Sequence, residues 1–241
     1  GGNAFRGLTA VCRSVEENAR NDNESQGHAE KTAELVGKAL KIQPESAEAQ
    51  QALTLLRSGQ LLTQSELARD ARLSQPTVHR YLNLLEATHM FERLPAYTAS
   101  HTTRLLKSPK AFWNDTGLAI FLSGYFEEAD LRGAREAGAF FETLIYHHLR
   151  VLTRLMTPAS RLYFWRAIQG QEVDFVLEHG RRLLAIEVKR TANPRFGDAS
   201  GLRLFLTAHP QASGGILIHT GRAVRRLDEK IIAVPWTLVT G

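Results

Sequence analysis

The chain has 241 residues, of which 43% are hydrophobic and 23% charged, enough for one large domain or two smaller ones. Its net charge of +5 favours anionic partners, and its single cysteine, Cys12, excludes an intrachain disulfide framework. No signal peptide is visible and no apolar run approaches the roughly 18 residues of a membrane-spanning helix, so we expect a soluble, cytoplasmic protein.

Residues 1–44 carry no functional signal. The polar stretch 14–31 contains Asn, Ser and Gly residues that favour a loop, and residues 32–42 have the apolar spacing of a short helix. The chain begins at Gly1 without a methionine, which indicates a fragment or a processed chain. We interpret residues 1–44 as a linker or as the remnant of an upstream domain.

Two short helices joined by a tight turn are predicted after a first helix that runs from Pro44 to Arg57. Thr63 and Glu66 have the spacing of a capping box, and Ser74 stands where it would cap the next helix. That last helix has an apolar face at positions i, i+3, i+4 and i+7, formed by Val78, Tyr81, Leu82 and Leu85. The pattern is typical of a helix-turn-helix.

The exposed side of the last helix is polar, and a hairpin follows it. The polar positions are Gln75, Thr77, Arg80 and Asn83. Strands are expected at 90–97 and 110–115, joined by a segment that carries Arg104 and Lys107 in the manner of a wing. Residues 45–132 therefore predict a winged helix-turn-helix domain, with DNA contacts from the helix and phosphate contacts from the wing. Because the helix face holds only one arginine, packing against another protein is the alternative.

A long amphipathic helix is predicted from Ala137 to Met156, after an acidic connector at 127–136. Its apolar stripe consists of Phe140, Phe141, Leu144, Ile145, His148, Val151, Leu152 and Leu155, and we expect it to be mostly buried. His147 and His148 do not form a metal-ligand pair, because adjacent helical residues point about 100° apart.

The strongest pattern is a hairpin from Glu172 to Lys189 with a turn at Gly180. If its loop has an even number of residues, Asp174, Glu187 and Lys189 share one face. The apolar residues expected on the other face are Val173, Phe175, Leu177, Leu184, Ile186 and Val188. An odd loop or a bulge would break this alignment.

Carboxylates beside a lysine suit a hard cation such as Mg²⁺, with the lysine holding an anionic oxygen or a water. Asp174 followed by Glu187, Val188 and Lys189 resembles the D…(E/D)-x-K core of the PD-(D/E)XK nuclease superfamily. The resemblance implies a further acidic residue, Glu142, from the preceding helix. It also implies metal ligands at Glu142, Asp174, Glu187 and the Val188 carbonyl, and a catalytic role for these acids and Lys189.

The elements of residues 133–241 agree with that superfamily in their order. A strand at 162–168 precedes the hairpin, and a helix at 198–208 and strands at 215–219 and 231–236 follow it. A helix, three strands, a helix and two apolar strands indicate an α/β domain around a mixed central sheet.

Several further motifs occur in order between residues 45 and 240. They are Ser65 to Ala68, Thr77 to Leu85, Ser108 to Lys110, Asp115 to Leu118, Phe164 to Arg166, Glu172 to Phe175, Ile186 to Lys189 and Val234 to Trp236. The series resembles the C-terminal region of a prokaryotic family of AAA-type ATPases that carry a domain of unknown function. This resemblance implies an upstream ATPase domain, although this chain contains no P-loop motif and hence no ATP site of that kind.

Two functions follow as hypotheses. The first is a DNA endonuclease dependent on Mg²⁺ or Mn²⁺, in which Arg166, Gln171, Arg190 and Arg195 hold the backbone of double-stranded DNA. The second is a non-enzymatic module that uses the nuclease fold as a scaffold to bind DNA or protein and to regulate the ATPase.

Overall fold

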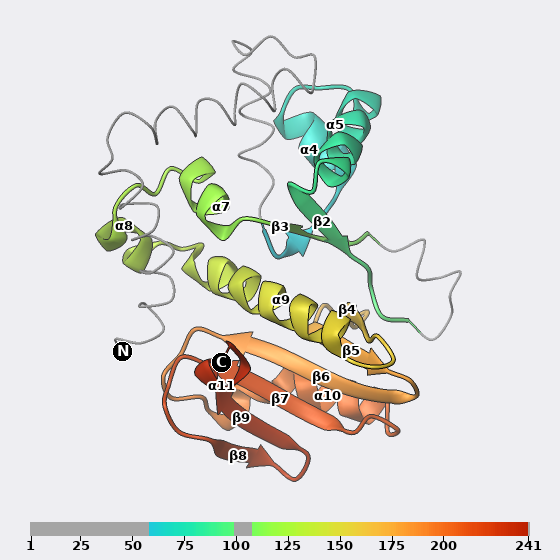
Figure 1. The fold of residues 1–241 in the computed structure, drawn as a ribbon, viewed down its shortest axis with the longest axis vertical. Coiled ribbons are helices and arrows are strands. Elements are labelled where there is room, and N and C mark those ends of the chain that lie inside the picture. Colours follow the sequence, from blue (N-terminus) through green and yellow to red (C-terminus); the bar gives the residue numbers. More distant parts are fainter. Residues whose placement is uncertain (1–57, 99–107, 241) are drawn as a thin grey trace.

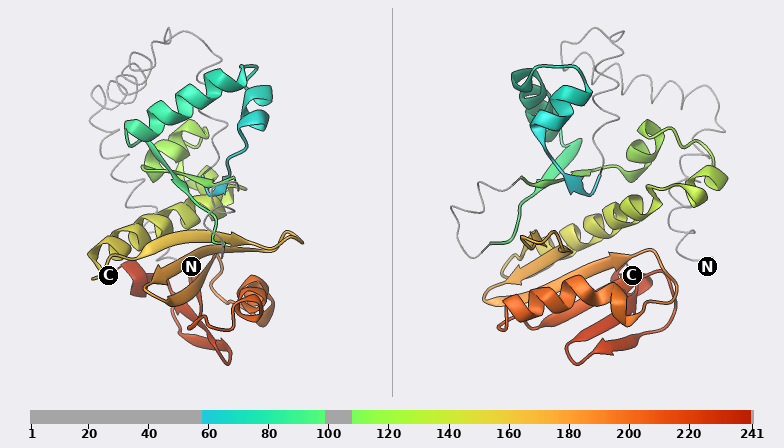
Figure 2. Two further views of the ribbon diagram at one scale, coloured as in Figure 1. Left: turned by 90° about the vertical axis from the view of Figure 1, so that its right-hand side faces the viewer. Right: turned by 180° about the vertical axis from the view of Figure 1, so that it is seen from behind.

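The computed structural model describes residues 58–98 and 108–240, which form a mixed α/β structure (Figure 1). A small sheet with short helices forms one unit and a six-stranded sheet forms the other. Helix α9 (Ala137–Leu155) lies between them in all three ribbon views of Figures 1 and 2. The expectations for residues 1–44, for the helix Pro44–Arg57 and for Arg104 and Lys107 fall outside the described residues.

The small unit begins with helices α4 (Gln64–Asp70) and α5 (Gln75–Ala87), which match the two predicted helices. Ser74 caps α5, because its Oγ accepts a hydrogen bond from the Thr77 N–H at 3.3 Å. The predicted capping box of α4 is wrong: Thr63 occupies the N-cap, but its side chain makes no capping bond. Val78, Leu82 and Leu85 are buried and Tyr81 is half-buried, so α5 packs by the predicted face.

A three-stranded antiparallel sheet completes this unit. It contains β1 (Gln60–Leu61), β2 (Phe91–Leu94) and β3 (Lys110–Trp113) in the order β1-β3-β2. Beyond β2 the chain reaches the other unit, where Ala96 forms a parallel bridge with Phe164. The small sheet is thus joined by backbone pairing to the first strand of the large one.

Three helices connect the sheets: α7 (Thr116–Leu122), α8 (Glu128–Gly133) and α9. The predicted connector at 127–136 therefore contains a short helix. The predicted stripe of α9 is wrong at its end, where Val151, Leu152 and Leu155 are exposed. The buried positions there are Leu149 and Thr153, which continue the four-residue spacing from Phe141 and Ile145.

The large sheet is mixed, as predicted. Its strands are β4 (Arg161–Arg166), β5 (Glu172–His179), β6 (Arg182–Lys189), β7 (Gly214–His219), β8 (Arg225–Asp228) and β9 (Ile231–Pro235). They lie in the order β4-β5-β6-β7-β9-β8, with β6, β7 and β9 parallel and the other pairs antiparallel. The sequence did not predict β8, a short edge strand whose two arginines are exposed.

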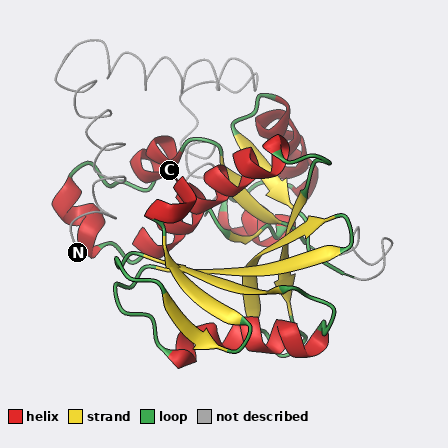
Figure 3. Ribbon diagram, turned by 60° about the horizontal axis from the view of Figure 1, so that its bottom comes forward, coloured by secondary structure: helices red, strands yellow, loops and turns green. Residues whose placement is uncertain are grey.

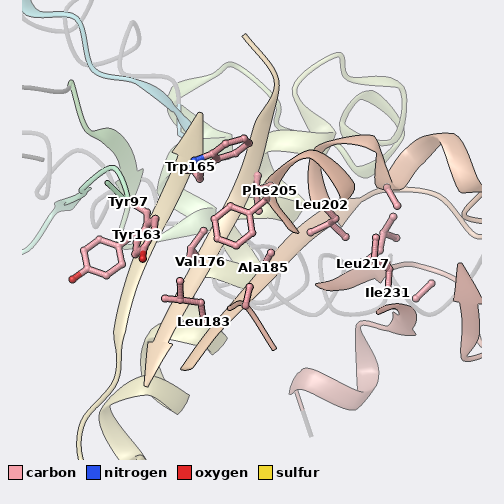
Figure 4. Packing of buried hydrophobic residues seen from close by; sticks show 14 residues of the cluster. Tyr97, Tyr163, Trp165, Val176, Leu183, Ala185, Leu202, Phe205, Leu217 and Ile231 are labelled. Atoms are coloured by element: carbon pink, nitrogen blue, oxygen red, sulfur yellow. The ribbon is translucent and has the colours of Figure 1, made fainter. Parts of the chain in front are cut away.

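Helices cover both faces of the large sheet. Helix α9 lies on one face and α10 (Ser200–Ala208), which follows the 3₁₀ turn η1 (Phe196–Ala199), lies on the other (Figure 3). A last short helix, α11 (Thr237–Thr240), packs near α9. The core on the α10 side includes Val176, Ala185, Leu202 and Phe205, which meet between the strands and α10 in Figure 4.

The core on the α9 side is shared by the two units. Phe175, Ile186 and Val188 from the large sheet pack there with Leu94 and Phe112 from the small one. Phe112 also stacks on Tyr146 of α9, with ring centroids 4.2 Å apart. Burying these apolar surfaces together fixes the small sheet over α9 and thereby places β3 above the start of β5.

The hairpin β5–β6 has an even loop, which was the condition for a shared face, but its alternation is not regular. Phe175 pairs with Ile186 and His179 with Arg182, which leaves the two-residue turn Gly180-Arg181. The β4–β5 register shifts between Tyr163 and Trp165, and Val173 packs on the α10 side, away from Phe175. The prediction that Val173 shares a face with Phe175 is therefore wrong, because an irregularity interrupts the alternation beside Asp174.

Candidate carboxylate and lysine site

A cluster of charged side chains lies where α9, the large sheet and the small sheet meet. It contains Glu142 from α9, Glu172 and Asp174 from β5, Glu187 and Lys189 from β6, and Lys110 from β3. We refer to these six residues as the carboxylate cluster. Four of them, Glu142, Asp174, Glu187 and Lys189, were predicted as site residues from the sequence.

Lys110 is the residue that the sequence did not predict. Its side chain is 3% exposed, and its Nζ lies 3.1 Å from Glu142 Oε1, 3.5 Å from Glu172 Oε2 and 3.6 Å from Asp174 Oδ1. A buried ammonium group needs such partners, because leaving water is otherwise very costly. The one signal in the sequence is a lysine that opens the apolar run Lys110-Ala111-Phe112-Trp113, all four of which are buried.

Lys110 remains charged in this environment. Burial alone lowers the pKa of its ammonium, but the negative charges of Glu142, Asp174 and Glu172 outweigh burial and raise the pKa above its usual value. One cation thus serves three carboxylates from two elements of the C-terminal unit.

Asp174 and Glu187 are anchored in different ways. Asp174 Oδ2 accepts a hydrogen bond from the Val188 N–H at 2.8 Å, which ties β5 to β6 beyond the last regular pair. Glu187 is 8% exposed, and its Oε1 lies 2.7 Å from the Nζ of Lys189. Its other oxygen, Oε2, is buried without a hydrogen-bond partner. A buried carboxylate oxygen without a hydrogen-bond partner indicates that a proton or a cation could bind on this side of the cluster.

The two glutamates hold their protons more tightly than usual. Burial, followed by the charge of Asp174, raises the pKa of Glu142 to about 8 and that of Glu187 to about 8. Lys110 and Lys189 oppose this effect but do not cancel it, because Lys110 is shared among several carboxylates. The negative charge of Asp174 therefore contributes to the raised pKa of both glutamates.

Backbone approaches close the cluster on two sides. A Cβ on Gly59, whose φ is +76°, would lie 3.2 Å from Glu142 Oε2. A Cβ on Gly201 in α10 would lie 2.2 Å from the Glu172 carbonyl oxygen and 3.5 Å from Glu187 Oε2. A side chain at Gly201 would clash with the backbone of β5, whereas at Gly59 the positive φ favours glycine and a Cβ would press on the Glu142 carboxylate.

The composition of the cluster fits a hard cation, but its arrangement favours Lys110. Oxygen donors are the ligands that Mg²⁺ prefers, and Glu187 Oε2 is one such donor without a partner. Within residues 58–98 and 108–240, however, no three His, Cys, Asp or Glu side chains are grouped as a metal site requires. The cation that these carboxylates face in the structure is Lys110, whose Nζ lies 3.1 Å from Glu142 Oε1 and 3.6 Å from Asp174 Oδ1.

The four predicted backbone-binding residues of the C-terminal unit are all exposed: Arg166, Gln171, Arg190 and Arg195. Arg166 is closest to the cluster, with its Nη1 3.3 Å from Glu172 Oε1. Arg190 donates hydrogen bonds to the Arg132 carbonyl oxygen at 3.3 and 3.4 Å. Arg195 precedes η1, where its backbone N–H binds Asp198.

The predicted DNA-reading residues of α5 are less uniform. Gln75, Arg80 and Asn83 are exposed, whereas Thr77 is half-buried and its hydroxyl bonds that of Ser74 at 2.7 Å. Asn83 uses both ends of its amide within the small unit, in hydrogen bonds with His79 at 3.0 Å and Arg93 at 2.9 Å. This face is therefore open to solvent and partly occupied by its own neighbours.

Comparisons with known proteins match two parts of the chain to two different family models. Residues 137–239 match a family described as Domain of unknown function (DUF4143), and residues 36–129 match Domain of unknown function (DUF8612). No solved structure matches the chain. No helix in the described part of the chain has the length and apolar character needed to cross a membrane.

Two curated relatives are mycobacterial. The proteins named Uncharacterized protein Rv2008c, from Mycobacterium tuberculosis, and Uncharacterized protein Mb2031c, from Mycobacterium bovis, are each 30% identical to this chain over 177 residues. The match covers 73% of this chain but only 38% of each relative. The chain thus corresponds to well under half of these longer proteins.

Proposed function

We propose that residues 133–241 form a nuclease-like domain of the PD-(D/E)XK type that hydrolyses DNA phosphodiester bonds with the help of Mg²⁺ or Mn²⁺. The observation that carries the proposal is the meeting of Asp174, Glu187, Lys189 and Glu142 in one cluster at the join of α9, β5 and β6. These are the residues that resemble the superfamily's motif. The mixed sheet with a helix on each face also supports it.

Each residue of the cluster has a role in this proposal. Asp174, Glu187, Glu142 and the Val188 carbonyl would hold the ion, which polarises the phosphate and lowers the pKa of a bound water. Lys189 is 41% exposed, more than any other residue of the carboxylate cluster. It would position the attacking water or neutralise charge that develops on the phosphate.

DNA would be held from both units. In the small unit, helices α4 and α5 followed by β2 and β3 support a winged helix, in which Gln75, Thr77, Arg80 and Asn83 would face DNA. Arg104 and Lys107, which lie outside the described residues, would add phosphate contacts. In the large unit, the exposed residues Arg166, Gln171, Arg190 and Arg195 would bind phosphates.

An ATPase is the expected partner domain. The family matched by residues 137–239 is often found with AAA-type ATPases, and the matched relatives are much longer than this chain. We propose that this chain is the C-terminal part of such a protein and that ATP hydrolysis elsewhere controls its action on DNA.

One observation favours a second function. Lys110 neutralises the carboxylates that a metal would use, so the cluster serves as an ionic contact between the units. In that case the C-terminal unit is a non-enzymatic scaffold that binds DNA or protein and regulates the ATPase.

Plasmid cleavage separates the two functions. Supercoiled plasmid is incubated with the wild-type chain and Mg²⁺ or Mn²⁺, beside Asp174→Ala and a control variant, Asp130→Ala, which removes an exposed acid of α8. The nuclease proposal expects cutting by the wild type and the control and none by Asp174→Ala. Equal cutting by all three points to a contaminant. No cutting by any of them, nor by a variant that lacks the Lys110 charge, leaves the scaffold as the function.

A further inference from the structure

We infer that Lys110 is the resident cation of the carboxylate cluster, and that its ammonium group and a divalent metal ion exclude each other from the space between Glu142 and Asp174. The inference rests on the proposed metal site and adds a condition to it. A metal ion can use these carboxylates only when Lys110 withdraws, so the small unit controls metal binding by the large one.

The first argument is the geometry of Lys110. A single ammonium lies within 3.6 Å of oxygens from Glu142, Glu172 and Asp174, and the lysine side chain is 3% exposed. An ammonium group has three hydrogens to donate, and here three carboxylates surround it. The position between Glu142 and Asp174 is therefore filled by a positive charge that belongs to the chain.

The second argument is that two cations do not fit in this space. Mg²⁺ needs oxygens at about 2.0–2.1 Å in a near-octahedral arrangement, and it usually retains several waters. The oxygens that Glu142 and Asp174 turn toward Lys110 would have to supply this shell. Repulsion between the ion and the ammonium would be strong, because burial weakens screening by solvent.

The third argument is that Lys110 does not satisfy the cluster. Four carboxylates surround two ammonium groups, Lys110 and Lys189, and Glu187 Oε2 is buried without a partner. A divalent ion in place of Lys110 would bring one more positive charge to these carboxylates and would have that unpaired oxygen available as a ligand, which the ammonium leaves unused.

The fourth argument is the origin of Lys110 in the other unit. Strand β3 is held on α9 by Ser58, whose Oγ accepts hydrogen bonds from Thr143 Oγ1 at 2.8 Å and from the Trp113 N–H at 3.2 Å. Gly59 lies against the carboxylate of Glu142 on the same edge. A shift of this small sheet relative to α9 would draw Lys110 out, which links events on the small unit to the cluster.

The test is calorimetric titration of MnCl₂ into four forms of the chain at pH 7.5. They are the wild type, Lys110→Met, Lys110→Arg, and the double variant Lys110→Met/Glu172→Gln. The double variant removes one charge of each sign and spares the proposed ligands, so it remains informative if Lys110→Met alone does not fold. Adding Asp174→Ala to the double variant provides the control for binding at the cluster.

We expect Mn²⁺ to bind the double variant at least tenfold more tightly than the wild type or Lys110→Arg, and Asp174→Ala to abolish the gain. Equal affinity of the wild type and the double variant, or no binding to the double variant, would overturn the inference. Tight binding by the double variant without plasmid cleavage would refute the nuclease proposal and leave the exclusion intact. If the wild type cleaves plasmid and binds Mn²⁺ as tightly as the double variant, the nuclease proposal stands and the exclusion of metal by Lys110 is refuted.

Discussion

The carboxylate cluster and the exposed face of α5 both carry polar residues that the sequence predicted to be functional. The two regions differ in where these side chains find their hydrogen-bond and ion-pair partners. The cluster draws its residues from α9, β3, β5 and β6, buries Lys110 and Glu187, and leaves the other members partly exposed. The α5 face satisfies Asn83 with His79 and Arg93 of its own unit and leaves Arg80 exposed. Buried charge requires partners from distant parts of the chain, whereas exposed charge is satisfied by solvent and near neighbours.

The largest expected effect of this contrast is on stability. Lys110→Met leaves three partly buried carboxylates without their shared buried cation and should lower the free energy of unfolding by about 3–5 kcal/mol. Arg93→Met is the matched change near α5, where Arg93 pairs with Glu86 at 3.0 Å, and it should cost about 1 kcal/mol or less. Urea denaturation at pH 7.5 measures both. Similar losses in the two variants would mean that Lys110 contributes no more to the free energy of unfolding than a surface ion pair does.

The glycine that touches the cluster gives a smaller effect with an internal control. Gly59 and Gly124 both have positive φ, but an added Cβ meets Glu142 at 3.2 Å only in the first case and meets nothing within 4 Å in the second. Backbone strain should cost each alanine variant about 1–2 kcal/mol. Gly59→Ala should lose roughly 1 kcal/mol more, because it also displaces the Glu142 carboxylate. Equal midpoints of thermal unfolding for the two variants would contradict close packing on Glu142.

The pH dependence of stability is a third way to distinguish the two regions. Burial and the charge of Asp174 raise the pKa of Glu142 and of Glu187 to about 8, so the folded chain holds protons that the unfolded chain releases. The free energy of unfolding should therefore rise by roughly 3 kcal/mol as the pH falls from 8 to 6.5 in EDTA, about half of it from each glutamate. The charged groups facing these glutamates are Lys110, Glu172, Asp174 and Lys189.

The window ends near pH 6.5 because histidines with a lowered pKa act in the opposite direction. Burial lowers the pKa of His147, His148, His209 and His219, so they destabilise the fold as they take up protons at lower pH. Glu142→Gln should remove roughly half of the rise between pH 8 and 6.5, whereas Glu86→Gln, near α5, should leave it unchanged. Stability that falls over this interval in the wild type would show that the glutamates are ionised as usual.

The smallest expected effects are on DNA binding. If about four to six of the nominated basic residues neutralise phosphates, affinity should drop by roughly two to three decades between 50 and 200 mM salt. Arg80→Ala and Arg166→Ala should each reduce the slope of log K against log salt by about one unit. Asp174→Ala should bind at least as tightly as the wild type. Fluorescence anisotropy with a duplex oligonucleotide measures these changes, and absence of binding at 50 mM salt would favour a protein-binding role for both units.

Local patterns accounted for most of the elements. The hairpin could be predicted because alternation in β5 and β6 is a short-range property and Gly180, with a φ of +60°, suits the turn. The first helix of the C-terminal unit and the apolar strands β7 and β9 were equally clear. The short helix α8 and the polar edge strand β8 were missed because acidic or arginine-rich segments resemble loops in composition.

Features that depend on tertiary contacts could not be predicted. The irregularity beside Asp174 arises from the pairing of β5 with β4, and a sequence reading Val173-Asp174-Phe175 is also compatible with regular alternation. Lys110, on β3 of the small sheet, reaches Glu142 of α9 across 32 residues. The sequence motif includes Lys189 but not Lys110. The contacts of Lys110 with the carboxylates are created by the fold, so the sequence could not predict them.

The most direct test of the central claim, that this cluster is a catalytic cation site held closed by Lys110, is Mn²⁺-dependent plasmid cleavage by Lys110→Met/Glu172→Gln. We predict that this variant cuts supercoiled DNA faster than the wild type and that adding Asp174→Ala abolishes cutting. A folded double variant that binds Mn²⁺ and leaves the plasmid intact would contradict the claim.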